Sequence, residues 1–101
     1  MRDRSAELRA RCAALIDDGF ADPRLDARTL AALLGVSRRH LDRAHQGHDS
    51  IGDLLTRRRL QSVATLVAAS PATSLAAAAA QSGFSSYETF RRQRRLFATA
   101  A

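Results

Sequence analysis

The sequence is poor in several residue types, and each shortage excludes a class of protein. Cys12 is the only cysteine, so no disulfide can form within the chain and a reducing compartment fits. Proline occurs twice and polar and apolar residues do not alternate, which argues against β-strands. No apolar run approaches the length of a membrane span, and the start of the chain lacks the apolar core of a signal peptide. We therefore expect a soluble cytoplasmic protein without membrane contact.

Acidic residues are almost missing from the second half of the chain. Residues 1–53 contain nine arginines and nine acidic residues, whereas residues 54–101 contain seven arginines and a single acid, Glu88. The net charge of +6 therefore belongs to the second half. Such a basic region favours a polyanionic partner, nucleic acid rather than a membrane surface. On charge alone, a merely solvated basic surface remains the alternative.

The apolar residues that are present recur every three or four positions, which predicts an all-α fold of six or seven helices. Gly35 is the expected left-handed stop between two of these helices. The expected helices cover residues 5–18, 27–34, 38–46, 51–69, 75–81 and 86–97. The expected N-terminal caps are Asp26, Ser37, the Asp49–Ser50 pair, Thr73 or Ser74, and Ser85 or Ser86.

A short pattern occurs twice, in LAALLGVSRRHL (30–41) and in LAAAAAQSGFSSYETF (75–90), 48 residues apart. A small alanine lets two helices approach, a glycine takes the positive φ of the turn, an apolar residue fills the angle, and a serine caps the next helix. A large apolar anchor follows. The members of the first copy are Ala31, Gly35, Val36, Ser37 and Leu41, and those of the second are Ala79, Gly83, Phe84, Ser85 and Phe90. Two copies joined by a long helix predict two helix-turn-helix motifs.

The segments LAALLGVSRRHLDR, LLTRRRLQSVATLV and LAAAAAQSGFSSYETFRR resemble the DNA-binding domain of AraC/XylS transcription regulators, over about residues 10–97. The resemblance implies two homeodomain-like subdomains, about 5–48 and 72–101, joined by a linker helix over 50–70. It implies that two recognition helices enter successive major-groove segments of double-stranded DNA. It also implies a monomer on an asymmetric site, contact with RNA polymerase, and a cytoplasmic, nucleoid-associated protein.

Three positions depart from the family pattern, and each loses apolar volume. The family usually has a large aromatic at His45, a branched aliphatic at Ala78 and a second phenylalanine at Arg94. The family also usually continues beyond Ala101 with a proline-containing helix, so the second subdomain looks truncated at its C-terminus. Because large-to-small core changes are costly, we predict lower stability and weaker DNA binding in the second subdomain.

The candidate DNA contacts follow from the two recognition helices. Arginine reads guanine with two hydrogen bonds, and Glu88 accepts a hydrogen bond from cytosine. A solvated charged face is the alternative for the arginines, and core packing is the alternative for Tyr87. The candidates are Ser37, Arg38, Arg39, His40 and Arg43 in the first helix, and Ser85, Ser86, Tyr87, Glu88, Arg91, Arg92 and Arg95 in the second.

Other polar residues give weaker signals. The negative charge of Asp42 would repel a phosphate, so we expect this residue to pair with an arginine. The linker arginines 57–59 contact either phosphate or acidic residues of the neighbouring subdomain. The three histidines, His40, His45 and His48, lack the further ligands of a metal site, and no catalytic constellation is present. We expect no metal, no cofactor and no enzymatic activity. The competing function is a degenerate helix-turn-helix module that acts through protein contacts or binds DNA without sequence preference.

Overall fold

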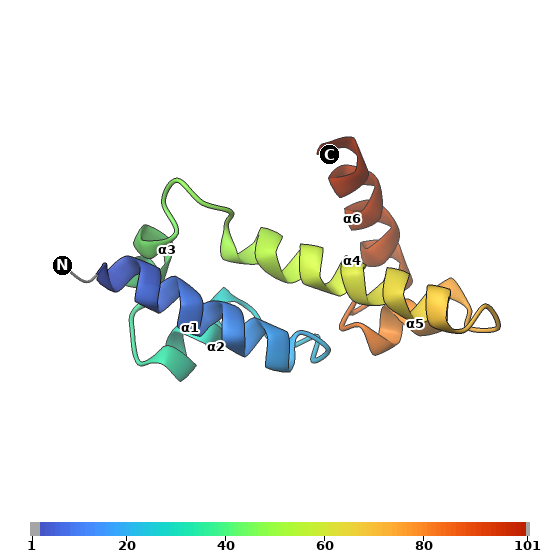
Figure 1. Cartoon of the computed structure of the whole chain (residues 1–101), viewed down its shortest axis with the longest axis horizontal. Coiled ribbons are helices and arrows are strands. Elements are labelled where there is room, and N and C mark those ends of the chain that lie inside the picture. Colours follow the sequence, from blue (N-terminus) through green and yellow to red (C-terminus); the bar gives the residue numbers. More distant parts are fainter. Residues whose placement is uncertain (1–2, 101) are drawn as a thin grey trace.

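The computed structural model describes residues 3–100, and the side chains of residues 3–98. This part of the chain folds into helices without a strand, so the all-α prediction is confirmed. Figure 1 shows the helices along an elongated molecule, with the two termini far apart. No helix in the described part combines the length and apolarity that crossing a membrane requires. The helices are α1 (Arg4–Gly19), α2 (Ala27–Leu34), α3 (Arg38–Ala44), α4 (Ile51–Ala69), α5 (Leu75–Gln81) and α6 (Tyr87–Ala100).

Side-chain caps set most helix starts where the sequence predicts them. Asp26 and Thr29 form a reciprocal capping box at the start of α2. Ser37, Ser50 and Ser74 each accept a hydrogen bond from the backbone three residues on, which fixes the starts of α3, α4 and α5. The predicted ranges of α2, α4 and α5 are therefore confirmed.

The predicted boundaries of three helices, α1, α3 and α6, are wrong by one to three residues. Helix α1 continues through Gly19, and Phe20 keeps a right-handed helical conformation at its end. Helix α3 stops at Ala44 rather than at residue 46. His45 explains this early end, because its ring Nδ1 donates to the carbonyl of Leu41 (3.0 Å) in place of a backbone N–H. Helix α6 begins at Tyr87 and extends past residue 97 to Ala100.

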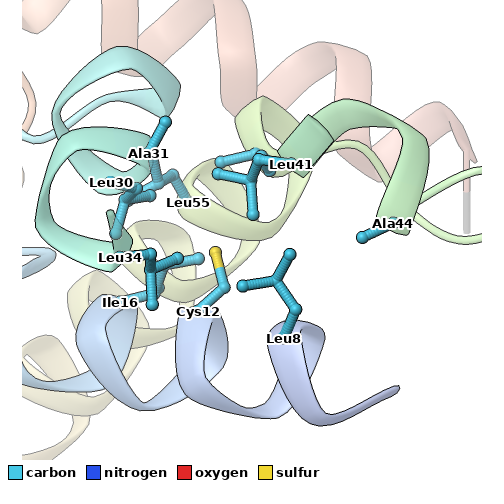
Figure 2. Packing of buried hydrophobic residues seen from close by; sticks show 10 residues of the cluster. Leu8, Cys12, Ile16, Leu30, Ala31, Leu34, Leu41, Ala44 and Leu55 are labelled. Atoms are coloured by element: carbon cyan, nitrogen blue, oxygen red, sulfur yellow. The ribbon is translucent and has the colours of Figure 1, made fainter. Parts of the chain in front are cut away.

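The larger hydrophobic core lies among α1, α2, α3 and the first turns of α4. Figure 2 shows its side chains converging, with Cys12 of α1 between the leucines of the neighbouring helices. Val36 and Leu54 are partly buried against it. We call this group the N-terminal cluster; its buried members are Leu8, Cys12, Ile16, Leu30, Ala31, Leu34, Leu41, Ala44, Ile51 and Leu55.

A smaller core lies between the second half of α4 and helices α5 and α6. The rings of Phe84 and Phe90 meet edge to face, with centroids 5.3 Å apart. Leu60, Leu66 and Val67 of α4 are partly buried against it. We call this group the C-terminal cluster; its buried members are Val63, Ala78, Ala79, Phe84 and Phe90.

Helix α4 belongs to both clusters. Ile51 and Leu55 near its start are buried in the N-terminal cluster, and Val63, two turns later, is buried in the C-terminal cluster. The molecule measures 49 × 26 × 23 Å, and its radius of gyration is 14.6 Å. A compact domain of this length has a radius of gyration of about 13 Å. The excess reflects two cores arranged along one helix instead of one central core.

Candidate nucleic-acid interface

The two helix-turn-helix segments, α2–α3 and α5–α6, share the same backbone geometry. Val36 N–H donates to the carbonyl of Ala31 (3.1 Å), and Phe84 N–H donates to the carbonyl of Ala79 (3.2 Å). Gly35 and Gly83 both have positive φ angles, 71° and 96°. The alanines are buried where the two helices meet in each copy. The predicted sequence repeat is therefore a structural repeat as well.

The second copy contains one additional residue between its glycine and its helix. Ser86 Oγ accepts the N–H of Thr89 (3.1 Å), so Ser86, one of the two serines predicted as possible caps, caps α6. The assignment of this cap to Ser85 in the sequence repeat is wrong. The N–H of Leu41 donates to the carbonyl of Ser37, and the N–H of Phe90 donates to that of Ser86. Each apolar anchor thus follows its cap by four residues, which restores the same register in both helices.

Helix α3 exposes a cationic face. Arg39 and Arg43 lie on the side opposite the buried Leu41, and neither makes an ion pair with a described residue. Arg38 pairs with Asp42 at 3.3 Å, as predicted for Asp42. Both side chains of that pair are more than half exposed, so the pair contributes little to stability. The exposed candidates on this helix are Ser37, Arg38, Arg39, His40 and Arg43.

Helix α6 exposes a second cationic face, at the opposite end of the molecule. Glu88, Arg91, Arg92 and Arg95 recur at intervals of three and four residues, and with Arg94 they line a shallow cleft of about 360 Å³. Four guanidinium groups around one carboxylate make this cleft favourable for anions. Arg94 differs from the others, because its guanidinium lies over the ring of Phe90, 5.2 Å from the centroid.

Tyr87 was interpreted from the sequence either as a DNA contact or as part of the core, and the structure shows it partly packed and partly exposed. Its ring packs against Phe90, with centroids 5.7 Å apart, while 42% of the residue remains exposed. One face of the ring therefore supports the core, and the remainder is available at the start of α6. Ser85 and Ser86 are exposed beside it, and Ser86 uses its hydroxyl for the cap.

The linker arginines all have partners within the protein. Arg57 reaches Asp49 (3.5 Å) and lies over the ring of Phe97. Arg58 pairs with Asp17 of α1 (3.1 Å) and lies over the ring of Phe20, 4.1 Å from its centroid. Arg59 forms no ion pair within 4.0 Å of a described acidic side chain; it donates to backbone carbonyls, and the charge of Asp22 nearby acts on it electrostatically. Intramolecular contacts therefore account for all three guanidinium groups.

The remaining candidate reactive groups are few. Among the described residues, no three histidine, cysteine or acidic side chains are placed to hold a metal ion. His45 is buried, and its Nε2 has no hydrogen-bond partner among the described residues. Burial raises the pKa of the Cys12 thiol, so at neutral pH it is the protonated form that packs in the core.

A protein-family model described as a helix-turn-helix domain matches residues 30–99 of this chain. The match begins within α2 and ends near the end of α6, and it includes both repeated turns. No curated protein and no solved structure matches the chain. Since the family model covers more than half of the sequence, the chain belongs to this family of AraC-like helix-turn-helix domains, whose function is DNA binding in transcription regulation. Domains of this kind are typically not enzymes.

Proposed function

We propose that this domain recognises a specific sequence in double-stranded DNA, with α3 and α6 as its two recognition helices. The observation that carries the proposal is the duplicated turn, followed in each copy by a helix with an exposed arginine face. The molecule is 49 Å long, which exceeds the roughly 34 Å between successive major-groove segments on one side of DNA. In this proposal the two clusters mark two subdomains, about 5–48 and 72–101, joined by α4.

Each helix has residues suited to reading bases and residues suited to holding phosphates. On α3, Arg39 and Arg43 read guanine, while Ser37, Arg38 and His40 lie near the backbone of the DNA. On α6, Glu88 and Arg92 point away from Phe90 and reach bases. Tyr87 at the helix start contacts a phosphate or a thymine methyl group. Phosphate contacts on α6 come from Ser85, Ser86, Arg91 and Arg95.

The two surfaces differ in sequence, so the bound DNA site is asymmetric and one copy of the domain suffices to occupy it. If the domain activates transcription, the AraC-like pattern implies that it also contacts RNA polymerase, in the cytoplasm at the nucleoid. Binding releases counterions from the DNA, so affinity falls steeply with salt.

The test is selection of bound duplexes from a randomised library, followed by salt titrations on the selected and a scrambled sequence. We expect the selected site to bind at least ~10³-fold more tightly than scrambled DNA at physiological salt. Arg39→Ala and Arg92→Ala should each relax base preference, at different positions of the site. Discrimination against the wrong base at that position should fall ~5–150-fold, which corresponds to ~1–3 kcal/mol. Arg11→Ala, an exposed arginine of α1, removes the same charge and should leave base preference unchanged.

A second function, a module that works through protein contacts, is favoured by one observation. An apolar groove of about 540 Å³ lies between α4, α5 and α6, bounded by side chains such as Leu60, Val67 and Phe97. Equal binding of selected and scrambled DNA, abolished by salt in both, would contradict sequence recognition and support this alternative.

A further inference from the structure

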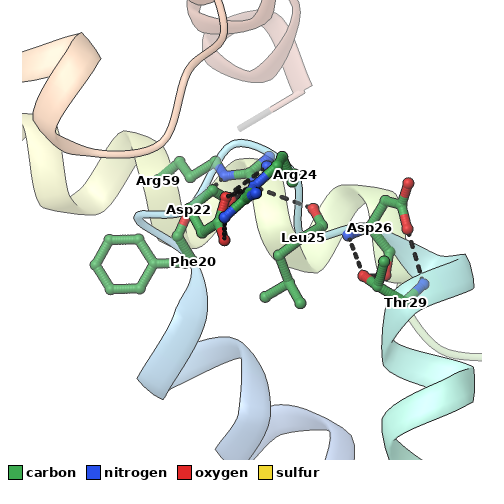
Figure 3. A network of polar contacts seen from close by, with 7 residues as sticks. All are labelled: Phe20, Asp22, Arg24, Leu25, Asp26, Thr29 and Arg59. Atoms are coloured by element: carbon green, nitrogen blue, oxygen red, sulfur yellow. Dashed lines mark hydrogen bonds and ion pairs between the residues drawn. The ribbon is translucent and has the colours of Figure 1, made fainter.

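Arg59 of α4 is joined by hydrogen bonds to the loop that connects α1 and α2. Its Nε donates to the carbonyl of Phe20 (2.9 Å), and its Nη2 donates to the carbonyls of Asp22 (3.0 Å) and Leu25 (3.1 Å). Figure 3 shows the guanidinium group enclosed by this loop, next to the start of α2 at Asp26. A partly buried charge is tolerated only when its donors are satisfied, so the three carbonyls define one position for the loop on α4.

The turn before α6 packs against the same place. A Cβ atom at Gly83 would overlap the carbonyl oxygen of Phe20, and would lie 2.9 Å from Arg59 Nε and 3.1 Å from Ala21 Cα. The preceding residue, Ser82, is fully buried and donates its hydroxyl to Ser62 of α4 (2.8 Å). Three segments from different parts of the sequence therefore meet at Arg59: the end of α1, the middle of α4 and the turn before α6.

The equivalent turn in the first copy has no such contact. Gly35 also has a positive φ, but a Cβ atom there would meet nothing within 4 Å. At Gly35 only the positive φ of the turn requires a glycine. At Gly83 a glycine is required both by the positive φ and by the close approach of another segment. The close contact is thus a feature of the second turn alone, and it joins the two ends of the molecule.

We propose that Arg59 and Gly83 are positioning residues that fix the distance and orientation between the cationic faces of α3 and α6. Helix α4 links the two ends covalently, but a single helix leaves the turn before α6 free to shift against the end of α1. The contact of Gly83 with Phe20 and Arg59 removes that freedom. Its consequence for DNA rests on the proposed function, because it makes the spacing between the two recognised segments invariant.

The contact is tested without DNA by measuring the distance between spin labels on α3 and α6 by pulsed electron resonance. Labels are attached at His40→Cys and Arg92→Cys in a Cys12→Ala background, with circular dichroism as the check on folding. We expect one narrow distance distribution for the parent and a broadened or shifted one for Arg59→Met, which keeps chain length but removes every donor. Arg58→Met, which removes the ion pair with Asp17 and the stacking on Phe20 but none of the three atoms nearest to a Cβ atom at Gly83, should keep the narrow distribution.

Alanine substitutions at the two glycines supply a second, independent pair of test and control variants. Gly83→Ala should shift the distribution, because the added methyl group displaces the turn from Phe20. Gly35→Ala imposes similar backbone strain in open space and should leave the distance unchanged. If Arg59→Met and Gly83→Ala both fold and both retain the parental distribution, α4 alone fixes the geometry and the proposal is overturned.

DNA binding supplies a further measurement if a selected site is available. Insertion of one base pair between the two recognised segments should weaken the parent protein at least ~10-fold, because only one helix then fits at a time. Arg59→Met should bind the unaltered site less tightly and discriminate less against the insertion. An equal insertion penalty in both proteins would contradict the proposal. Failure to select any site would contradict the proposed function and leave the distance measurement to decide on the contact.

Discussion

The two ends of this molecule contain the same helix-turn-helix pattern on very different cores. Both turns have the alanine–glycine hydrogen bonding, the capping serine and the apolar anchor four residues after the cap. Among the described residues, however, ten are buried in the N-terminal cluster and five in the C-terminal cluster. Two of those five are alanines, which contribute little apolar area. Turn chemistry therefore specifies the local fold, while the amount of buried surface sets how firmly that fold is held.

Arg94 contributes to this difference. Its side chain borders the apolar groove between α4, α5 and α6, and its guanidinium covers the ring of Phe90. A charged group in that place shields part of the groove but adds less apolar contact than a phenylalanine would. The lower stability that the sequence predicts for the second half stays a prediction, supported by the smaller cluster.

The largest expected effect comes from removing the anchors of the two recognition helices. Phe90 and Leu41 are both fully buried. Phe90→Ala should cost ~3–5 kcal/mol and Leu41→Ala ~2–5 kcal/mol. Because the C-terminal cluster is small, Phe90→Ala should unfold α5 and α6 while α1 to α3 stay folded. Hydrogen exchange measured by amide position checks this. Equal loss of protection in α1 and α6 would mean that the two ends unfold as one unit.

A smaller gain is expected from filling the apolar groove. Arg94→Leu places apolar atoms against Leu60 and Phe97, which should stabilise the C-terminal end by about 1 kcal/mol. Arg92→Leu is the matched control, because Arg92 lies on the opposite, exposed face of α6 and should give no such gain. Chemical denaturation, followed with exchange protection of α6, measures both. A gain from Arg92→Leu equal to that from Arg94→Leu would refute the explanation through the groove.

The smallest expected effect is a selective loss of stability in acid. The backbone N–H of Thr29 holds the pKa of Asp26 below its ordinary value of 3.8, and the hydrogen bonds from Arg24 lower the pKa of Asp22. A lowered pKa in the folded state means that the stabilisation is present above about pH 4 and is lost as the pH falls through the folded-state value. Both groups precede α2, so the N-terminal end should weaken as the pH falls below about 4.

Asp26→Asn is the matched variant for the acid experiment. Asparagine caps a helix about as well as aspartate but does not titrate. We expect it to retain α2 at neutral pH and to reduce the acid-dependent loss of protection there. Exchange protection of α2 that falls equally with pH in both proteins would show that Asp26 is not responsible.

Much of the fold was predictable, because its helix starts depend on short-range chemistry. Asp26, Ser37, Ser50 and Ser74 cap within three residues of their own position, and such pairs are visible in the sequence. The adjacent serines 85 and 86 left the start of α6 ambiguous, since either hydroxyl suits a cap. The spacing from cap to anchor resolves it, because Leu41 and Phe90 both follow their caps by four residues.

The contacts of Arg59 were not predicted, because its acceptors are backbone carbonyls, which every residue has and which the sequence therefore does not distinguish. A signal was nevertheless present, since Arg59 is four residues from both Leu55 and Val63. It therefore lies in line with the buried face of α4. The difference between Gly35 and Gly83 was equally hidden, because the sequence pattern around both is the same and only a distant segment distinguishes them. The early end of α3 depended on the ring of His45, which replaces a backbone donor.

Sharing α4 between two cores constrains how the gene for this protein can change. A residue inserted between Leu55 and Val63 would turn everything after it by about 100° and move it about 1.5 Å along the helix axis. Val63 would then leave its cluster, and Arg59 or Gly83 would miss the end of α1. Point substitutions along the exposed side of α4 carry no such penalty. Exposed positions in the middle of this helix should therefore accept exchanges of residue type, whereas insertions and deletions there should be rejected, so that the length of the helix is inherited more strictly than the identity of its exposed residues.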